Sequence, residues 1–225
     1  MSLLSRFKNS TSSRKTTVDK DLRQIVQLEK ASARVSQRYL NMGFGFLFLL
    51  AVWIFAYFHT GGVEVYSIVT VAALIGAYMA MNIGANDVAN NVGPAVGSKA
   101  LTLVGALCIA AVFEAAGAMI AGGEVISTIS KSIVSPDSFA DKTIFIWAMM
   151  AALLSAAVWV NLATYIGAPV STTHSIVGGV IGAGIAAAGF MAVDWGVMMK
   201  IAASWVISPV LGGVIAAAFL AFIKF

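Results

Sequence analysis

Long apolar stretches separated by short polar breaks follow residue 40 of this chain. A transmembrane helix needs roughly 20 mostly apolar residues. The pattern predicts six apolar helical segments, at 42–58, 65–83, 101–121, 143–166, 176–193 and 197–225. Inside lipid the backbone polar groups must bond within the chain, so stretches of this length favour helices over open sheet. We therefore expect an all-α, polytopic transmembrane protein.

Composition and charge agree with this class. The chain is 60% apolar and 11% charged, with a mean hydropathy of +0.90, far from a soluble globular domain. Nine basic and three acidic residues precede the first apolar stretch, so this segment carries +6 and the remainder −2 of the net charge of +4. A basic flank before a span predicts a cytoplasmic N-terminus, a simpler interpretation than nucleic-acid binding.

Three regions follow from this pattern. Residues 1–40 are a basic cytoplasmic segment, 41–64 a first span with an outer turn at 59–62, and 65–225 the remaining membrane part. About forty polar residues precede the first span, unlike a secretory signal peptide, so we expect the segment to be retained. Its Ser/Thr-rich start is expected to be disordered and residues 18–39 to form an amphipathic helix on the membrane surface.

Glycine, proline and cysteine positions add local expectations. Gly178 and Gly182 have the small-xxx-small spacing that lets membrane helices approach closely, and this tendency is extended by Gly117, Gly122, Gly123 and Gly184. Pro94 is expected to end or bend the second span, and Pro209 to kink the last one. Cys108 is the single cysteine, which excludes a disulfide within the chain.

A first polar island, Gly-Ala-Asn-Asp-Val-Ala-Asn-Asn at 84–91, interrupts the second span. If the helix continues through it, Asn82, Asn86 and Asn90 lie on one face, with Asp87 and Asn91 beside them. Such groups in a membrane usually face a cavity, a ligand or each other. Carboxylate and amide oxygens are hard ligands that suit an alkali cation, with a proton on Asp87 as the alternative.

A second island, Gly-Ala-Pro-Val-Ser-Thr-Thr-His-Ser at 167–175, has different chemistry. A helix beginning near Pro169 would leave the N–H groups of 170–173 without intrahelical partners. These donors and the neighbouring hydroxyls suit an oxyanion such as phosphate or sulfate. The same hydroxyls could complete a sodium shell, so cation and anion would each lower the cost of binding the other. Lys99 is the only basic residue near either island.

Residues of these types also have purely structural interpretations. A single Ser or Thr in a membrane helix usually bonds back to a carbonyl, and a single Asn often bridges helices; clusters of both favour a site. Glu114 lies within the third span, where an unpaired carboxylate is costly. His174 could cap the second island, bind substrate or bond locally. Asp194 and Lys200 are expected at a membrane edge.

At these residues the chain resembles the inorganic phosphate transporter (PiT) family of sodium– or proton–phosphate symporters, which includes some sulfate permeases. The motif at 84–90 with its continuation at 96–102 resembles the first family signature, and 169–174 with Gly178 resembles the second. The resemblance covers about 66–225. It implies broken or re-entrant helices, ligands midway across the membrane between two inverted repeats, and a dimer.

The resemblance also implies ligands by position. The implied phosphate ligands are Ser171, Thr172, Thr173, Asn86 and Asn90, and the implied coupling-ion ligands are Asp87, Asn86, Asn90, Glu114 and Ser171, with sodium at Asn86, Asp87 and Thr172. Each signature occurs once, whereas the family usually carries two repeats in a longer chain. We therefore expect one repeat, as a truncated product, one half of a split transporter, or a subunit pairing with its own copy.

The predicted function is secondary transport of inorganic phosphate across the cell membrane, coupled to sodium or a proton and needing no other cofactor. A sulfate permease is the nearest alternative, and a non-transporting membrane subunit or truncated remnant is the second. A membrane enzyme is disfavoured, because the sequence shows no nucleophile–base pair, metal triad or nucleotide-binding loop. The expected partners are phosphate, the coupling ion, lipid and a second half-transporter chain or copy, with no nucleic acid.

Overall fold

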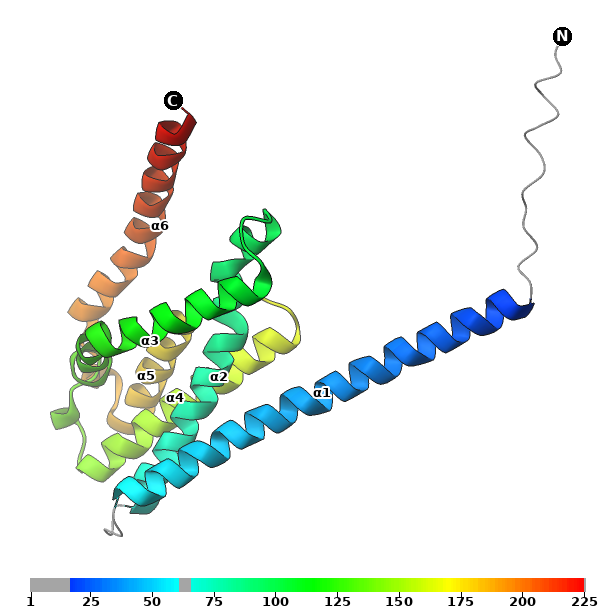
Figure 1. The fold of residues 1–225 in the computed structure, drawn as a ribbon. Coiled ribbons are helices and arrows are strands. Elements are labelled where there is room, and N and C mark those ends of the chain that lie inside the picture. Colours follow the sequence, from blue (N-terminus) through cyan, green and yellow to red (C-terminus); the bar gives the residue numbers. More distant parts are fainter. Residues whose placement is uncertain (1–16, 61–65, 225) are drawn as a thin grey trace, which may run out of the picture. The chain divides into compact units, whose positions relative to one another are not determined.

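The computed structural model describes residues 17–60 and 66–224, and this part of the chain is almost entirely helical (Figure 1). The long helices are α1 (Thr17–Thr60), α2 (Tyr66–Gly97), α3 (Leu103–Ser127), α4 (Lys142–Tyr165), α5 (Thr172–Ala188) and α6 (Trp195–Lys224). A π-helical turn, η2 (Thr128–Ser132), and two 3-10 turns, η3 (Pro136–Ser138) and η4 (Phe190–Ala192), complete the order. The predicted all-α polytopic class is confirmed.

Five of the helices contain a stretch long and apolar enough to cross a membrane. The exception is α5, which has 17 residues. At 1.5 Å per residue it is about 25 Å long, shorter than the roughly 30 Å hydrocarbon core. The apolar segment expected at 176–193 is therefore a shorter helix that begins earlier, at Thr172. It stops before Gly189, whose φ of 87° lies in the left-handed region.

The first helix is continuous from Thr17 to Thr60. The region expected to form a separate surface helix at 18–39 and the first span are thus parts of one helix. By internal contacts the chain divides into two units, Met1–Ala51 and Val52–Phe225, with the boundary inside α1. The expected disorder of the N-terminal start, at 1–16, and part of the turn at 59–62 lie outside the described residues.

Helix α2 continues through the first polar island and past Pro94, ending at Gly97. Proline removes one backbone donor but keeps its own carbonyl, and the carbonyl of Pro94 accepts from the N–H of Ser98 at 3.0 Å. Lys99 then reverses the chain with φ at 62°. The helix therefore extends several residues beyond the proline at which an end or bend was expected.

The second unit is built around α4, which packs against both α2 and α5. Small side chains on α4 allow this approach: Ala152, Ala156 and Ala157 are buried. Val160 of α4 is also buried, next to Met79 of α2. The helix thus joins the two segments that carry the polar islands.

The polar stretch between α3 and α4 carries a buried apolar centre that its composition did not predict. Ile133 and Val134 are among the least exposed residues of the described chain. An isolated β-bridge joins Val134 to Val193, and the N–H of Asp194 donates to the carbonyl of Ile133 at 2.9 Å. The segment is therefore anchored to the connection between α5 and α6.

Close packing around α5 is provided by Gly184, one of the glycines predicted to allow it, and by Gly179. A Cβ on Gly179 would lie 2.6 Å from the carbonyl oxygen of Ala152, and one on Gly184 would lie 2.7 Å from a methyl of Val134. Gly178 and Gly182 would meet nothing within 4 Å. The expectation that Gly178 and Gly182 bring helices together is wrong within the described chain. Both residues line a groove on α5 instead.

Replacing Gly179 with Ala is expected to destabilise the α4–α5 hairpin, because the added methyl must displace the backbone of Ala152. Overpacking of this kind costs about 1–3 kcal/mol. Gly178→Ala is the matched control, since its methyl meets open space. Thermal unfolding in detergent should show a lower midpoint for Gly179→Ala alone; equal midpoints would contradict the assigned packing.

Candidate functional site

The polar stripe predicted on α2 faces α4 and the turn that follows it. Asn82 and Asn86 are buried, with 4% and 6% of their surfaces exposed, whereas Asn90 is exposed. The amide nitrogen of Asn161 on α4 donates to Oδ1 of Asn82 at 2.9 Å, and Nδ2 of Asn82 donates to the Tyr78 carbonyl at 2.8 Å. The first residue of the stripe therefore joins two helices through paired amides.

Asn86 contacts the α4–α5 turn with both ends of its amide. Its Nδ2 donates to Thr164 Oγ1 and to the Ala168 carbonyl, each at 3.1 Å. Its Oδ1 accepts from the Val170 N–H at 3.2 Å. The sequence predicted that the N–H groups of 170–173 lack intrahelical partners. The first of them, the N–H of Val170, therefore bonds to Asn86 of the first island.

Asp87 makes the third contact between the islands. Thr172 Oγ1 donates to Oδ2 of Asp87 at 3.0 Å, and the Thr172 side chain is buried with 6% of its surface exposed. A hydroxyl and a carboxylate placed in this way present several oxygen atoms close together. The structure thus brings together Asn86, Asp87 and Thr172, the three residues to which the resemblance assigned sodium.

The N-terminus of α5 is capped by Ser171, whose Oγ accepts from the N–H of His174 at 3.3 Å. The N–H and hydroxyl of Ser175 both bond to the Ser171 carbonyl. Among the described residues, no acceptor is bonded to the N–H groups of Thr172 and Thr173. These two donors, at the positive end of the helix dipole, are available to an anion.

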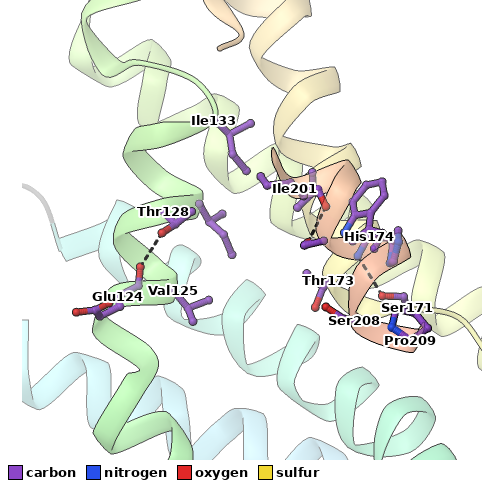
Figure 2. Close-up of a pocket in the computed structure, with 14 residues that line it drawn as sticks. Glu124, Val125, Thr128, Ile133, Ser171, Thr173, His174, Ile201, Ser208 and Pro209 are labelled. Atoms are coloured by element: carbon purple, nitrogen blue, oxygen red, sulfur yellow. Dashed lines mark hydrogen bonds between the residues drawn. The ribbon is translucent and has the colours of Figure 1, made fainter. Parts of the chain in front are cut away.

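Ser171 and Thr173 lie on the other side of this helix start and line a cavity of about 520 Å³ between α3, α5 and α6 (Figure 2). Glu124 of α3 and Thr128, which directly follows that helix, form the opposite wall, and Ser208 of α6 lies beside the α5 residues. Successive residues of a helix turn by about 100°. The hydroxyl cluster is therefore divided, with Thr172 toward Asp87 and its neighbours toward the cavity.

His174 contributes in two ways that the sequence left open. Its backbone N–H completes the Ser171 cap, and its ring lies against Trp205 of α6 with the ring centres 3.9 Å apart. The ring also lines the cavity. His174 therefore connects the start of α5 to α6.

Glu114 and Asn90 are placed differently from these residues. Glu114 is exposed on α3 and lines a separate groove of about 420 Å³ together with Asn91 of α2. Asn90 and Lys99 are exposed. Asp194, expected at a membrane edge, accepts from the N–H of Val197 at 2.9 Å and so caps α6.

Sequence reasoning did not identify the α3 and α6 walls of the cavity. By sequence, Glu124 only begins a polar connection, and Ser208 is only a neighbour of the kinking proline. A signal was present, because Ser204 and Ser208 lie four residues apart on an otherwise apolar helix and both line the cavity. The contribution of α3 depends on tertiary packing and has no such local pattern.

Comparison with known proteins places this geometry in a family. Residues 83–225, which include both islands, match the phosphate transporter family. A "Putative phosphate permease" of Helicobacter pylori is 52% identical over 204 residues, covering 91% of this chain and 38% of that protein. The "Inorganic phosphate transporter 2-1, chloroplastic" of Arabidopsis thaliana is 48% identical over 143 residues, covering 63% and 24%.

A solved structure described as "The sodium-dependent phosphate transporter" is also similar, with a TM-score of 0.63 and 44% identity over 66% of this chain and 37% of that one. The chain thus spans about two fifths or less of the length of these relatives. The match to the family covers well over half of the residues of this chain. This multi-pass membrane protein therefore belongs to the phosphate transporter family, a family of transporters and not of enzymes.

Proposed function

We propose that this chain forms one half of a transporter that moves inorganic phosphate across a membrane together with sodium. The observation that carries the proposal is the 3.0 Å contact between Thr172 and Asp87, which joins the acidic island of α2 to the N-terminus of α5. A carboxylate suited to a cation and a helix start suited to an anion thereby become neighbours. The family match supports phosphate as the substrate, and the similarity to a sodium-dependent phosphate transporter supports sodium as the coupling ion.

The cation would be held by oxygen atoms of Asp87 and Thr172. The Thr172 hydroxyl that donates to the carboxylate can rotate and offer a lone pair to an ion instead. Asn86 Oδ1 accepts one hydrogen bond and has a second lone pair, which makes it a further candidate ligand of the cation. A proton on Asp87 is the alternative coupling ion.

The anion would be held by the N–H groups of Thr172 and Thr173 and by the hydroxyls of Ser171 and Thr173. Asn90 is proposed as a further phosphate ligand from α2, and Glu114 is proposed only as a further ligand of the coupling ion, from α3. Thr172 takes part on both sides, since its side chain faces the carboxylate while its N–H belongs to the anion-binding helix start. This shared residue gives the coupling a physical basis, because each ion fixes the group that the other needs.

The remaining ligands would come from a second half, either another chain or a copy of this one, because the Helicobacter pylori relative is more than twice as long. The basic segment before the first span favours a cytoplasmic N-terminus in a cell membrane. Alternating access would then involve movement of a substrate-bearing bundle against a scaffold.

The test is uptake of radiolabelled phosphate into liposomes that contain the purified chain, with and without an inward sodium gradient. Equilibrium phosphate binding to the same preparation is measured in parallel. Sodium-driven uptake supports the proposal, and sodium-dependent binding without uptake supports the half-transporter. A folded chain that neither binds nor transports phosphate would overturn the proposal, and displacement of bound phosphate by equimolar sulfate would reassign the substrate.

A further inference from the structure

Asn86 makes more side-chain contacts with the α4–α5 turn than any other described residue of the first island. Both of its amide hydrogens have acceptors, and its oxygen accepts from the turn. We infer that Asn86 is a positioning residue, which holds the turn so that the start of α5 is directed at Asp87. This inference rests on the proposed function only for the identity of the bound ligand, phosphate.

The amide matches the turn because it bonds on both sides of Pro169. The carbonyl of Ala168 precedes the proline and the N–H of Val170 follows it, and one primary amide satisfies both. Pro169 has no N–H of its own, so it contributes no donor to hold this segment. We call the contacts of Asn86 with Thr164, Ala168 and Val170 the amide clamp.

Other side chains cannot reproduce the clamp. Asp has no donor for the Ala168 carbonyl, and its charge would face that oxygen. Leu has the same branching at Cγ as Asn, with methyl groups in place of the amide atoms, and can make none of the three bonds. Because Asn86 is buried, its removal would leave the partner groups of the turn without bonds in an apolar setting.

The clamp acts through the residues that follow it. Val170 immediately precedes Ser171, the cap of α5, and Thr172 follows one residue later with its hydroxyl on Asp87. Asn86 and Asp87 are adjacent on α2, so the clamp and this contact share one short segment of each element. Fixing the turn therefore fixes the distance between the hydroxyl and the carboxylate.

A loosened turn would weaken ligand binding even though the binding groups of α5 itself are all retained. If only a fraction of the molecules presents the correct turn, the apparent dissociation constant rises by the reciprocal of that fraction. By analogy with residues that orient metal ligands, we expect a 10-fold to 100-fold higher half-saturating phosphate concentration for Asn86→Leu, about the range seen for such supporting contacts.

Asn82 provides a matched control. It is as buried as Asn86, lies one helical turn away on the same face, and also joins α2 to α4 through its amide. Its hydrogen bonds go to Asn161 and Tyr78 and not to the turn. Asn82→Leu should therefore lower thermal stability about as much as Asn86→Leu while leaving the turn in place.

The experiment uses a spin label at the turn and phosphate binding in the same variants. In the full chain with Cys108→Ser, the exposed Ile166 is changed to Cys and labelled. We expect Asn86→Leu to increase label mobility and weaken phosphate binding, and Asn82→Leu to do neither. Unchanged mobility in Asn86→Leu would overturn the clamp, and weaker binding with unchanged mobility would make Asn86 a direct ligand.

Equal mobility changes in both variants would also overturn the inference, since they would show general loosening of the α2–α4 contact. The label reports on the turn even if the wild-type chain binds no phosphate. Failure of the proposed function is therefore distinguishable from failure of the clamp.

Discussion

Asp87→Asn is expected to abolish sodium-driven phosphate uptake, with a loss of about 100-fold or more, of the size seen when ligand shells are disrupted. The substitution keeps the shape of the side chain and an oxygen that can accept from Thr172. It removes the negative charge that offsets the cost of taking a cation out of water. Loss of transport in a folded variant would therefore identify charge, and not packing, as the contribution of Asp87.

The matched control is Asp194→Asn. Asp194 is a carboxylate of the same unit, but it caps α6 through the N–H of Val197, a bond that an Asn oxygen can keep. Uptake by this variant should stay close to wild type. Sodium-stimulated uptake by Asp87→Asn at the wild-type rate would show that the cation binds elsewhere, and selective loss of proton-driven uptake would identify the proton as the coupling ion.

Thr172→Val is expected to weaken both sodium and phosphate dependence. Valine keeps the shape of threonine and the backbone N–H but loses the hydroxyl that bonds to Asp87. A hydrogen bond to a charged group contributes about 1.5–3 kcal/mol, which corresponds to about a 10-fold to 150-fold change in an equilibrium constant. The half-saturating concentrations of both ions should therefore rise by at least about 10-fold.

Thr173→Val separates the two effects, because Thr173 faces the cavity and not Asp87. This variant should raise the half-saturating phosphate concentration and leave sodium dependence nearly unchanged. The measurement is initial uptake rate as each ion is varied with the other in excess. Identical profiles for the two threonine variants would contradict the division of the hydroxyl cluster between two sides of α5.

Local pattern was sufficient for much of the site. The four-residue spacing of Asn82 and Asn86 predicted a shared helix face, and the structure buries both there. Pro169 predicted a helix start nearby, and the helix begins three residues later, at Thr172, with Ser171 as its cap. These features depend on neighbours within a few positions, so the sequence contains the information directly.

The partners of these residues could not be predicted in the same way. The residue type of Asn86 predicts a ligand, and no local pattern predicts that its three bonds go to residues 78 to 84 positions away. The anchoring of Val134 beside Val193 and Gly184 is likewise a long-range contact. Packing among helices determines which residues become partners, and a single sequence carries no direct information about such long-range contacts.

The last part of α6 has a consequence for how the chain is made. From Val206 to Lys224 every residue is exposed within the described chain, and the most apolar window of the helix is entirely unburied. Its backbone bonds are internal to the helix and need no neighbour. A polar substitution such as Phe219→Ser would therefore affect the insertion of this helix into the membrane during synthesis. The substitution would raise the free energy of transferring the helix into lipid, and it would remove no contact with another described helix.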